Sequence, residues 1–218
     1  MPQKEYLKKQ NDFFSDLFNK HGFSVHSLHW SSEGTQNKRF VELLKIFLLC
    51  DTAGTVKLLD YGCGLGHLYK FLKDYDIISS LKIDYTGADM NEKFIHEARK
   101  NFPDARFRIK DDAIYKEEFG FVFCSGVFNL KFSEEFDIEK YYTEELFRLF
   151  ETSKYGVAVN FQSKEGLEMI PQKDLKKELK KFYFHDEDKV LENLKTITPN
   201  IRISKGYLPN DFTVYLLH

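Results

Sequence analysis

The segment Leu58-Leu59-Asp60-Tyr61-Gly62-Cys63-Gly64-Leu65-Gly66 places three glycines within five residues, directly after a short apolar run. The run from Val56 to Leu59 indicates a buried strand, and the residues from His67 to Lys73 are typical of a helix. Glycine has no Cβ and adopts positive φ readily, so a glycine turn lets a ligand approach the backbone. In open parallel sheets, ligands bind beyond the carboxyl ends of the strands. The segment therefore predicts a strand, a ligand-binding turn and a helix.

The spacing of these glycines indicates the kind of ligand. Dinucleotide-binding folds use Gly-x-Gly-x-x-Gly, with a pyrophosphate at the helix N-terminus. Here the spacing is Gly-x-Gly-x-Gly, and His67 stands where a dinucleotide loop has its third glycine. Asp60 would repel a pyrophosphate and attract a cation. S-adenosylmethionine carries a sulfonium and an ammonium group and no phosphate, so it suits this charge.

Apolar periodicity divides the chain into alternating elements. Strands are predicted over residues 56–59, 83–88, 106–109, 119–125, 155–161, 201–208 and 212–217. Helices are predicted over residues 4–20, 37–49, 67–73, 92–102, 141–150 and 190–197. Such alternation favours a doubly wound α/β fold with a mainly parallel seven-stranded sheet. A tight turn at Pro209 and Asn210 makes the last two strands an antiparallel hairpin.

The length of 218 residues suits a single domain. We expect residues 1–50 to form a helical N-terminal lid and residues 55–218 to form a Rossmann-like core. The longest apolar run, Ile46 to Cys50, is too short to span a membrane. The polar N-terminus lacks the apolar stretch of a signal peptide. The three widely spaced cysteines suggest no disulfide framework, so we expect a cytoplasmic protein.

The nine residues from Leu58 to Gly66 resemble motif I of the class I, Rossmann-like S-adenosylmethionine-dependent methyltransferases. The resemblance implies that S-adenosylmethionine is the cofactor, bound by residues of this motif and of the strand ends beside it. It also implies that Asp89, 23 residues after Gly66, binds the ribose hydroxyls and that Met90 packs on the adenine. The full set of expected cofactor-binding residues is Arg39, Asp60, Gly62, Cys63, Gly64, Gly66, Asp89, Met90, Asp111, Asp112 and Cys124.

Asp111 and Asp112 follow the third strand, where the family has an acidic residue near the adenine amino group. Alignment to the strand end favours the Asp111 side chain and the Asp112 backbone, although the reverse assignment stays open. Adjacent residues on a strand point to opposite faces, so we expect no shared metal. After the fourth strand, the chain lacks the Asn/Asp-Pro-Pro-aromatic signature of amino-directed DNA and protein methyltransferases, and Gly120 replaces the family's usual Asp.

Two further stretches resemble a narrower, bacterial subgroup of these enzymes. One is the head Trp30-Ser31-Ser32-Glu33-Gly34-Thr35-Gln36-Asn37-Lys38-Arg39-Phe40, of the pattern W-S-S-x-x-x-Q-x-x-R-F. The other is the tail Tyr207-Leu208-Pro209-Asn210-Asp211-Phe212-Thr213. The resemblance implies that Arg39 binds the methionine carboxylate of the cofactor, unless it forms a surface salt bridge. An association with surface-polysaccharide genes suggests a precursor of such a polymer as acceptor.

The acceptor is expected to be a small polar metabolite, methylated on oxygen or nitrogen. Its pocket is predicted between the loop at Trp30, the strand end at Phe128 and Asn129, and the stretch from Tyr207 to Asp211. Asn129 and Tyr207 are the candidate catalytic residues, and Trp30, Phe128 and Asp211 are the candidate substrate contacts.

Two other functions remain open. A non-catalytic nucleoside-binding module would use the same loop. A nucleic-acid methyltransferase would use the lysine-rich residues 173–181, but acidic residues and helically spaced leucines make this run more typical of a solvated helix face. The formal net charge of -2 also provides no general attraction to nucleic acid.

Overall fold

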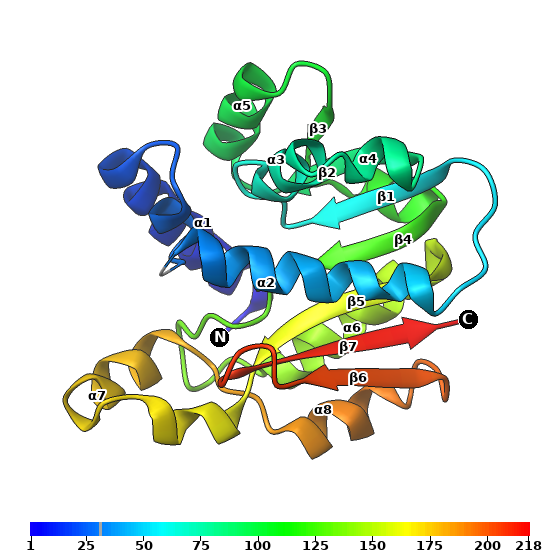
Figure 1. The fold of residues 1–218 in the computed structure, drawn as a ribbon. Coiled ribbons are helices and arrows are strands. Elements are labelled where there is room, and N and C mark those ends of the chain that lie inside the picture. Colours follow the sequence, from blue (N-terminus) through cyan, green and yellow to red (C-terminus); the bar gives the residue numbers. More distant parts are fainter. Residues whose placement is uncertain (31) are drawn as a thin grey trace.

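A computed structural model describes residues 1–30 and 32–218 of the chain, so Ser31 of the predicted head lies outside the described residues. Figure 1 shows a twisted sheet with helices on both faces. The sheet has seven strands in the order β3-β2-β1-β4-β5-β7-β6. The strands are β1 Val56–Tyr61, β2 Ile83–Asp89, β3 Arg106–Ile109, β4 Phe119–Cys124, β5 Ser153–Gln162, β6 Ile201–Lys205 and β7 Asp211–Leu217.

The predicted sheet is confirmed. The first five strands pair in parallel. Strand β7 is antiparallel to both of its neighbours, β5 and β6. Strand β6 is shorter than predicted because the chain turns at Gly206, whose φ is 81°. The carboxyl ends of the parallel strands and the start of β7 therefore lie on the same edge of the sheet.

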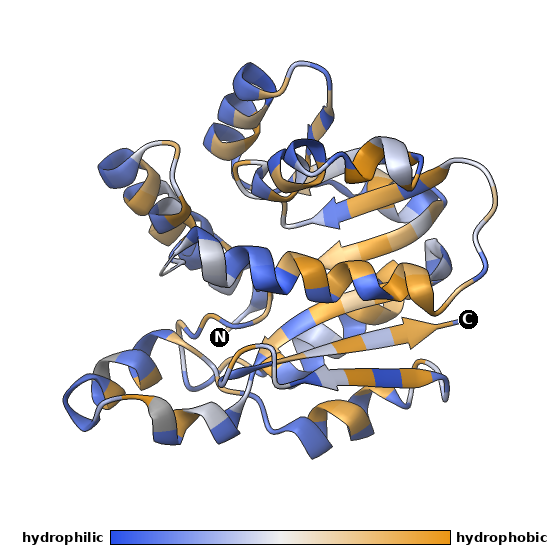
Figure 2. Cartoon of the chain, in the orientation of Figure 1, coloured by the Kyte–Doolittle hydropathy of each residue, from blue (hydrophilic) through white to orange (hydrophobic). Residues whose placement is uncertain are grey.

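Two hydrophobic layers fill the space between the sheet and its helices, and Figure 2 shows the apolar strands between helices with polar outer faces. The helices are α1 Gln3–His21, α2 Glu33–Leu44, α3 His67–Asp74, α4 Ile77–Ser80, α5 Glu92–Asn101, α6 Ile138–Glu151, α7 Gln172–Lys181 and α8 Glu187–Leu194. One layer joins the sheet to α2, α3 and α5, and the other joins it to α6 and α8. Short 3-10 turns are η1 Val25–Leu28, η2 Lys45–Leu48, η3 Asp112–Lys116 and η4 Lys164–Met169.

Local capping explains where several helices begin. The Asn91 side chain accepts hydrogen bonds from Lys93 N and Phe94 N, so it caps α5 as predicted. Helix α2 begins before the predicted residue 37 because the Ser32 hydroxyl accepts from Thr35 N at 3.2 Å. The lysine-rich run forms α7, although the side chain of Lys177 lies outside the described residues.

The first fifty residues form two parts, α1 with η1 and α2 with η2, which lie at different places on the sheet. Figure 1 shows α1 beyond the carboxyl ends of the parallel strands, whereas α2 lies along one face of the sheet. The buried residues Phe40, Leu43 and Ile46 place α2 and η2 in the hydrophobic layer. Only α1 and η1 therefore lie where a lid is expected. Among the described residues, no helix is both long and apolar enough to cross a membrane.

Candidate functional site

The glycine loop between β1 and α3 has the conformation expected of a ligand-binding turn. Gly62, Gly64 and Gly66 have φ angles of 77°, 54° and 83°. The loop is tied to the next strand, because the backbone N–H groups of Gly62 and Cys63 both donate to Ala88 O, at 2.8 and 3.1 Å. Residues other than glycine rarely adopt these φ angles. The loop therefore depends on its glycines for its shape.

Asp89 at the end of β2 holds the loop in place. Its Oδ2 accepts from Gly64 N at 2.9 Å, and its Oδ1 accepts from Asn91 N at 2.8 Å. Burial raises the pKa of this carboxyl, and the two backbone hydrogen bonds oppose that effect. Each oxygen keeps a second acceptor position, so the carboxylate can still receive hydroxyl donors. Met90, the predicted adenine contact, is half-buried beside it.

Asp60 lies almost fully buried beneath the loop, with 2% of its surface exposed. Burial raises the pKa of Asp60 to about 7, although a hydrogen bond from the Tyr85 hydroxyl at 2.6 Å lowers it. The negative charge of Asp89 raises it further. A buried carboxylate of this kind ionises more readily when a cation lies close to it. The site thus favours a positively charged group near Asp60.

Asp111 and Asp112 follow β3, as predicted, and they begin the 3-10 turn η3. Strand β3 ends at Ile109, and Asp111 caps η3 by accepting from Ala113 N at 3.1 Å. Both carboxylates are exposed and ion-paired, Asp111 with Arg108 at 2.9 Å and Asp112 with Arg148 at 3.0 Å.

Asp111 and Asp112 do not alternate along a strand, so the strand geometry from which we expected no shared metal is wrong for these two residues. Within residues 1–30 and 32–218, no group of three or more His, Cys, Asp or Glu side chains is arranged to hold a metal ion.

Helix α1 crosses the edge of the sheet where the loop lies. At one end, the Tyr6 hydroxyl donates to Leu130 O at 2.7 Å, in the segment after β4. Farther along, Asn91 Nδ2 donates to the Ser15 hydroxyl at 2.9 Å, at the start of α5. The segment after α1 then closes on the loop, because a Cβ built on Gly64 would lie 2.7 Å from Leu28 Cδ2. The N-terminal segment therefore covers the glycine loop directly.

Arg39 and Asp211 come together from the head and the tail of the chain. Arg39 Nη2 lies 2.5 Å from Asp211 Oδ2, and both side chains are almost completely buried. The guanidinium also lies 4.4 Å from the centre of the Trp30 ring. Arg39 Nε and Asp211 Oδ1 have no hydrogen-bond partner among the residues that the structure describes. Arg39 therefore forms a salt bridge, as the alternative prediction held, but this ion pair is buried and does not lie at the surface.

A cavity of about 570 Å³ opens beside this ion pair. Residues from α1, η1, α2, the end of β5, α7 and the turn before β7 line it. These residues are Leu17, Lys20, His21, His26, His29, Trp30, Thr35, Arg39, Gln162, Glu178, Lys181, Phe182, Leu208 and Asn210. Trp30 also lies against the chain after β4, since a Cβ on Gly126 would meet Trp30 Cη2 at 2.7 Å. The cavity therefore lies at the carboxyl edge of the sheet, next to the loop after β4.

The structure separates the other predicted pocket residues from this cavity. Phe128 is fully buried in the hydrophobic layer on α6 and packs against Tyr141, so its predicted role as a substrate contact is not supported. The Asn129 side chain accepts from Gln162 N at 3.0 Å and joins the β4 loop to β5. The hydroxyl of Tyr207 lies 2.8 Å from that of Thr213, and Tyr207 lines a groove beside α2 instead.

Several residues of the site carry no sequence signal. Lys20 and Gln162 line the cavity but belong to no motif, and Lys181 comes from the lysine-rich run, which by itself does not indicate a small-molecule site. Cys63 and Cys124 are buried, and burial raises the pKa of both thiols well above the ordinary value. Neither cysteine is therefore suited to act as a nucleophile.

No protein-family model matches the sequence, and no curated protein matches it. The fold is similar to that of solved methyltransferases. Magnesium protoporphyrin IX methyltransferase from Synechocystis PCC 6803, with bound S-adenosylhomocysteine, is 16% identical over 92% of this chain and 95% of its own, with a TM-score of 0.62. A plantazolicin methyltransferase in complex with a monoazolic desmethylPZN analog and S-adenosylhomocysteine is 15% identical over 98% of each chain, with a TM-score of 0.66.

A third solved structure, an S-adenosylmethionine-dependent methyltransferase from Clostridium acetobutylicum ATCC 824, is 13% identical over 94% of this chain and 97% of its own, with a TM-score of 0.59. These similarities extend over nearly the whole length of each protein. The chain therefore has the fold of the class I methyltransferases.

Proposed function

We propose that this chain is an S-adenosylmethionine-dependent methyltransferase that acts on a small polar acceptor. The observation that carries the proposal is the pairing of the glycine loop with Asp89. The backbone of Gly64 is bound to that carboxylate at 2.9 Å, at the carboxyl edge of a sheet with methyltransferase topology. Ligands of open α/β sheets bind at this edge.

The residues beside the loop fit the chemistry of S-adenosylmethionine. Asp89 has acceptor positions left for the two ribose hydroxyls, and Asp60 supplies a buried negative charge for the ammonium or sulfonium group. The Asp111 side chain and the Asp112 backbone are the candidates for the adenine, together with Met90. Because Leu28 lies against Gly64, we expect η1 to move when the cofactor enters.

The cofactor supplies a methyl group that is already activated for displacement by a nucleophile. The protein therefore has to align the acceptor and exclude water, and the α1–η1 lid suits the second task. Polar atoms without a partner in the described residues lie at the same edge of the sheet, including Ser125 Oγ after β4 and Gln162 Oε1 at the end of β5. These atoms can form hydrogen bonds with a ligand, so they support a polar acceptor. Transfer of a radiolabelled methyl group to small acceptors would distinguish an enzyme from a binding module.

The variant Asp89→Ala should weaken the binding of S-adenosylhomocysteine about 10- to 100-fold. Hydrogen bonds to a charged group contribute about 1.5–3 kcal/mol, and the variant also frees the N–H of Gly64. Isothermal titration calorimetry measures the change. The matched control is Asp84→Ala, because Asp84 lies on the same strand but pairs with Arg106 away from the loop. Wild-type affinity in Asp89→Ala would rule out the ribose assignment.

The raised pKa of Asp60 predicts a dependence on pH. As the pH rises through about 7, Asp60 ionises, so the affinity for S-adenosylhomocysteine should increase between pH 6 and 8. The stability of the ligand-free protein should decrease as the pH rises. A carboxyl whose pKa is raised in the folded state stabilises the fold at low pH, and this contribution is lost as the pH rises through the folded-state pKa. Calorimetry and urea unfolding measure the two effects.

The control for this prediction is Asp60→Asn, which has no titrating group at this position. Its affinity should show a weaker dependence on pH than that of the wild type over the same range. Parallel pH profiles for the two proteins would show that Asp60 does not interact with the charge of the ligand.

A further inference from the structure

The cavity beside Trp30 has the size and the lining of a small-molecule site. Its volume of about 570 Å³ falls in the range of roughly 300–1,000 Å³ that such sites have. Trp30 and Phe182 supply apolar walls, and the ring of His29 stacks on that of Phe182 with 5.1 Å between centroids. The cavity therefore accommodates a ligand with a flat or apolar body.

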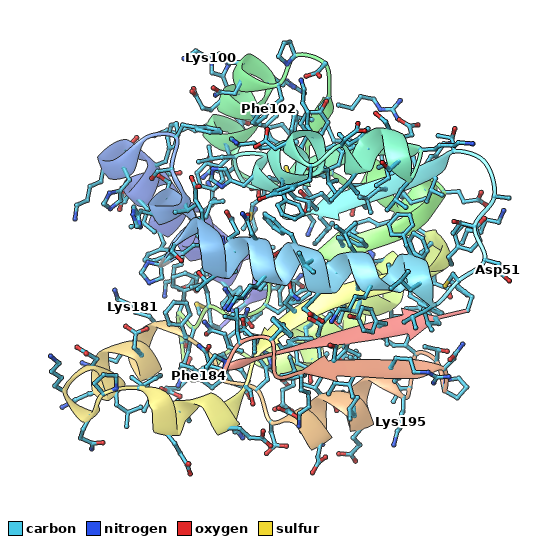
Figure 3. All side chains as sticks on the ribbon, viewed as in Figure 1. Asp51, Lys100, Phe102, Lys181, Phe184 and Lys195 are labelled. Carbon is cyan, nitrogen blue, oxygen red and sulfur yellow. The ribbon has the colours of Figure 1, made fainter. Side chains whose placement is uncertain are left out.

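The charges around this cavity are unequal. Lys20 and Lys181 line it, and neither side chain forms an ion pair with any residue in the described part of the chain. Figure 3 labels Lys181 at the end of α7, on the side of the molecule where α1 lies. Among the described residues that line the cavity, Glu178 is the one carboxylate. The charge of Arg39, which also lines the cavity, is already paired with Asp211. The unpaired charges thus leave a positive excess.

Three histidines, His21, His26 and His29, also line the cavity. His21 and His26 lie close together, with 6.0 Å between their rings. His26 Nδ1 lies 3.2 Å from Trp30 O. Because a carbonyl oxygen can only accept, the N–H at Nδ1 donates this hydrogen bond. A positive cavity with few competing carboxylates attracts anions and repels cations.

We propose that this cavity binds the methyl acceptor and that the acceptor carries an anionic group, a carboxylate or a phosphate, which Lys20 and Lys181 hold at the cavity mouth. The identity of the ligand as an acceptor rests on the proposed methyltransferase function. The charge preference of the cavity does not, because it follows from the lining residues alone. The two statements can therefore be tested separately.

Trp30 allows a direct test, because it is the only tryptophan of the chain and it lines the cavity. The fluorescence of the intact protein is quenched with iodide, with neutral acrylamide and with caesium, at constant and low ionic strength. Iodide should quench Trp30 at least about twofold more efficiently than caesium, relative to free tryptophan, since a net positive charge concentrates anions. The double variant Lys20→Ala/Lys181→Ala should remove this difference and leave acrylamide quenching unchanged.

The matched control is Lys180→Ala, which removes a neighbouring lysine of α7 that does not line the cavity. It should keep the preference for iodide. Equal quenching by iodide and caesium in the wild type would overturn the proposal. The proposal would also fail if the control variant lost the preference for iodide as fully as the double variant does. Circular dichroism confirms that each variant is folded.

A second measurement distinguishes the two anionic groups and extends the test to ligands. The probes are 4-hydroxybenzoate, phenyl phosphate and the uncharged 4-hydroxybenzamide, each titrated against Trp30 fluorescence. At least one charged probe should bind with at least about tenfold higher affinity than the amide. The double variant should bind that probe and the amide with similar affinity. Tighter binding of the amide than of both charged probes would contradict the proposal. If the charge preference is found but S-adenosylhomocysteine does not bind, the methyltransferase function fails and the anion site remains.

Discussion

The variant Gly64→Val is expected to lose measurable binding of S-adenosylhomocysteine, a decrease of about 100-fold or more. Gly64 has a φ of 54°, and a Cβ at this position would lie 2.7 Å from Leu28 Cδ2. Valine therefore strains the backbone and fills the face of the loop that a ligand must approach. A 100-fold decrease corresponds to about 2.7 kcal/mol of binding free energy, and calorimetry measures it directly.

The control separates this effect from backbone strain alone. Gly54 also has a positive φ, of 71°, but a Cβ there would have no atom within 4 Å. It lies before β1, away from the loop. The variant Gly54→Val should therefore bind the ligand as the wild type does, with some loss of stability. If Gly64→Val remains folded and binds with wild-type affinity, the glycine loop is not the cofactor site.

The variant Arg39→Ala should destabilise the protein by about 3–5 kcal/mol. Removing one partner of a buried ion pair leaves the other charge buried without compensation. Here Asp211 would remain, and burial already raises the pKa of its carboxyl while Arg39 lowers it. Urea unfolding followed by circular dichroism measures the loss. The double variant Arg39→Met/Asp211→Asn removes both charges and should recover most of the stability.

A single variant as stable as the wild type would show that the ion pair contributes little to folding. The double variant also tests the predicted role of Arg39 toward the methionine carboxylate. If that role is correct, the folded double variant binds adenosine normally and S-adenosylhomocysteine more weakly. Equal losses for both ligands would assign Arg39 to structure alone.

The sheet could be predicted from the sequence because local signals and tertiary packing agree there. The apolar run before the glycines forms β1, and β3 has the predicted bounds. Asn91 caps its helix by the side-chain hydrogen bonds that an N-cap residue makes. The one-turn helix α4 was not predicted, since four residues are too few to show a periodicity.

The candidate site was predicted only where a motif spans consecutive residues. The loop and Asp89 are contiguous with their strands, so their relation follows from strand order. Phe128 was assigned to the pocket because it follows β4, but the chain turns its ring into the core. The cavity lining depends on how α1, α7 and the turn before β7 pack together, and no local pattern records such long-range contacts.

Calorimetric titration of the wild-type protein with S-adenosylhomocysteine tests the central claim most directly. The glycine loop, Asp60 and Asp89 together predict one binding site with a dissociation constant in the micromolar range, which is about -8 kcal/mol of binding free energy. Binding of this strength would support the assignment of the loop to the cofactor. If protein that circular dichroism shows to be folded releases or absorbs no heat with S-adenosylhomocysteine or with S-adenosylmethionine, the methyltransferase assignment is wrong.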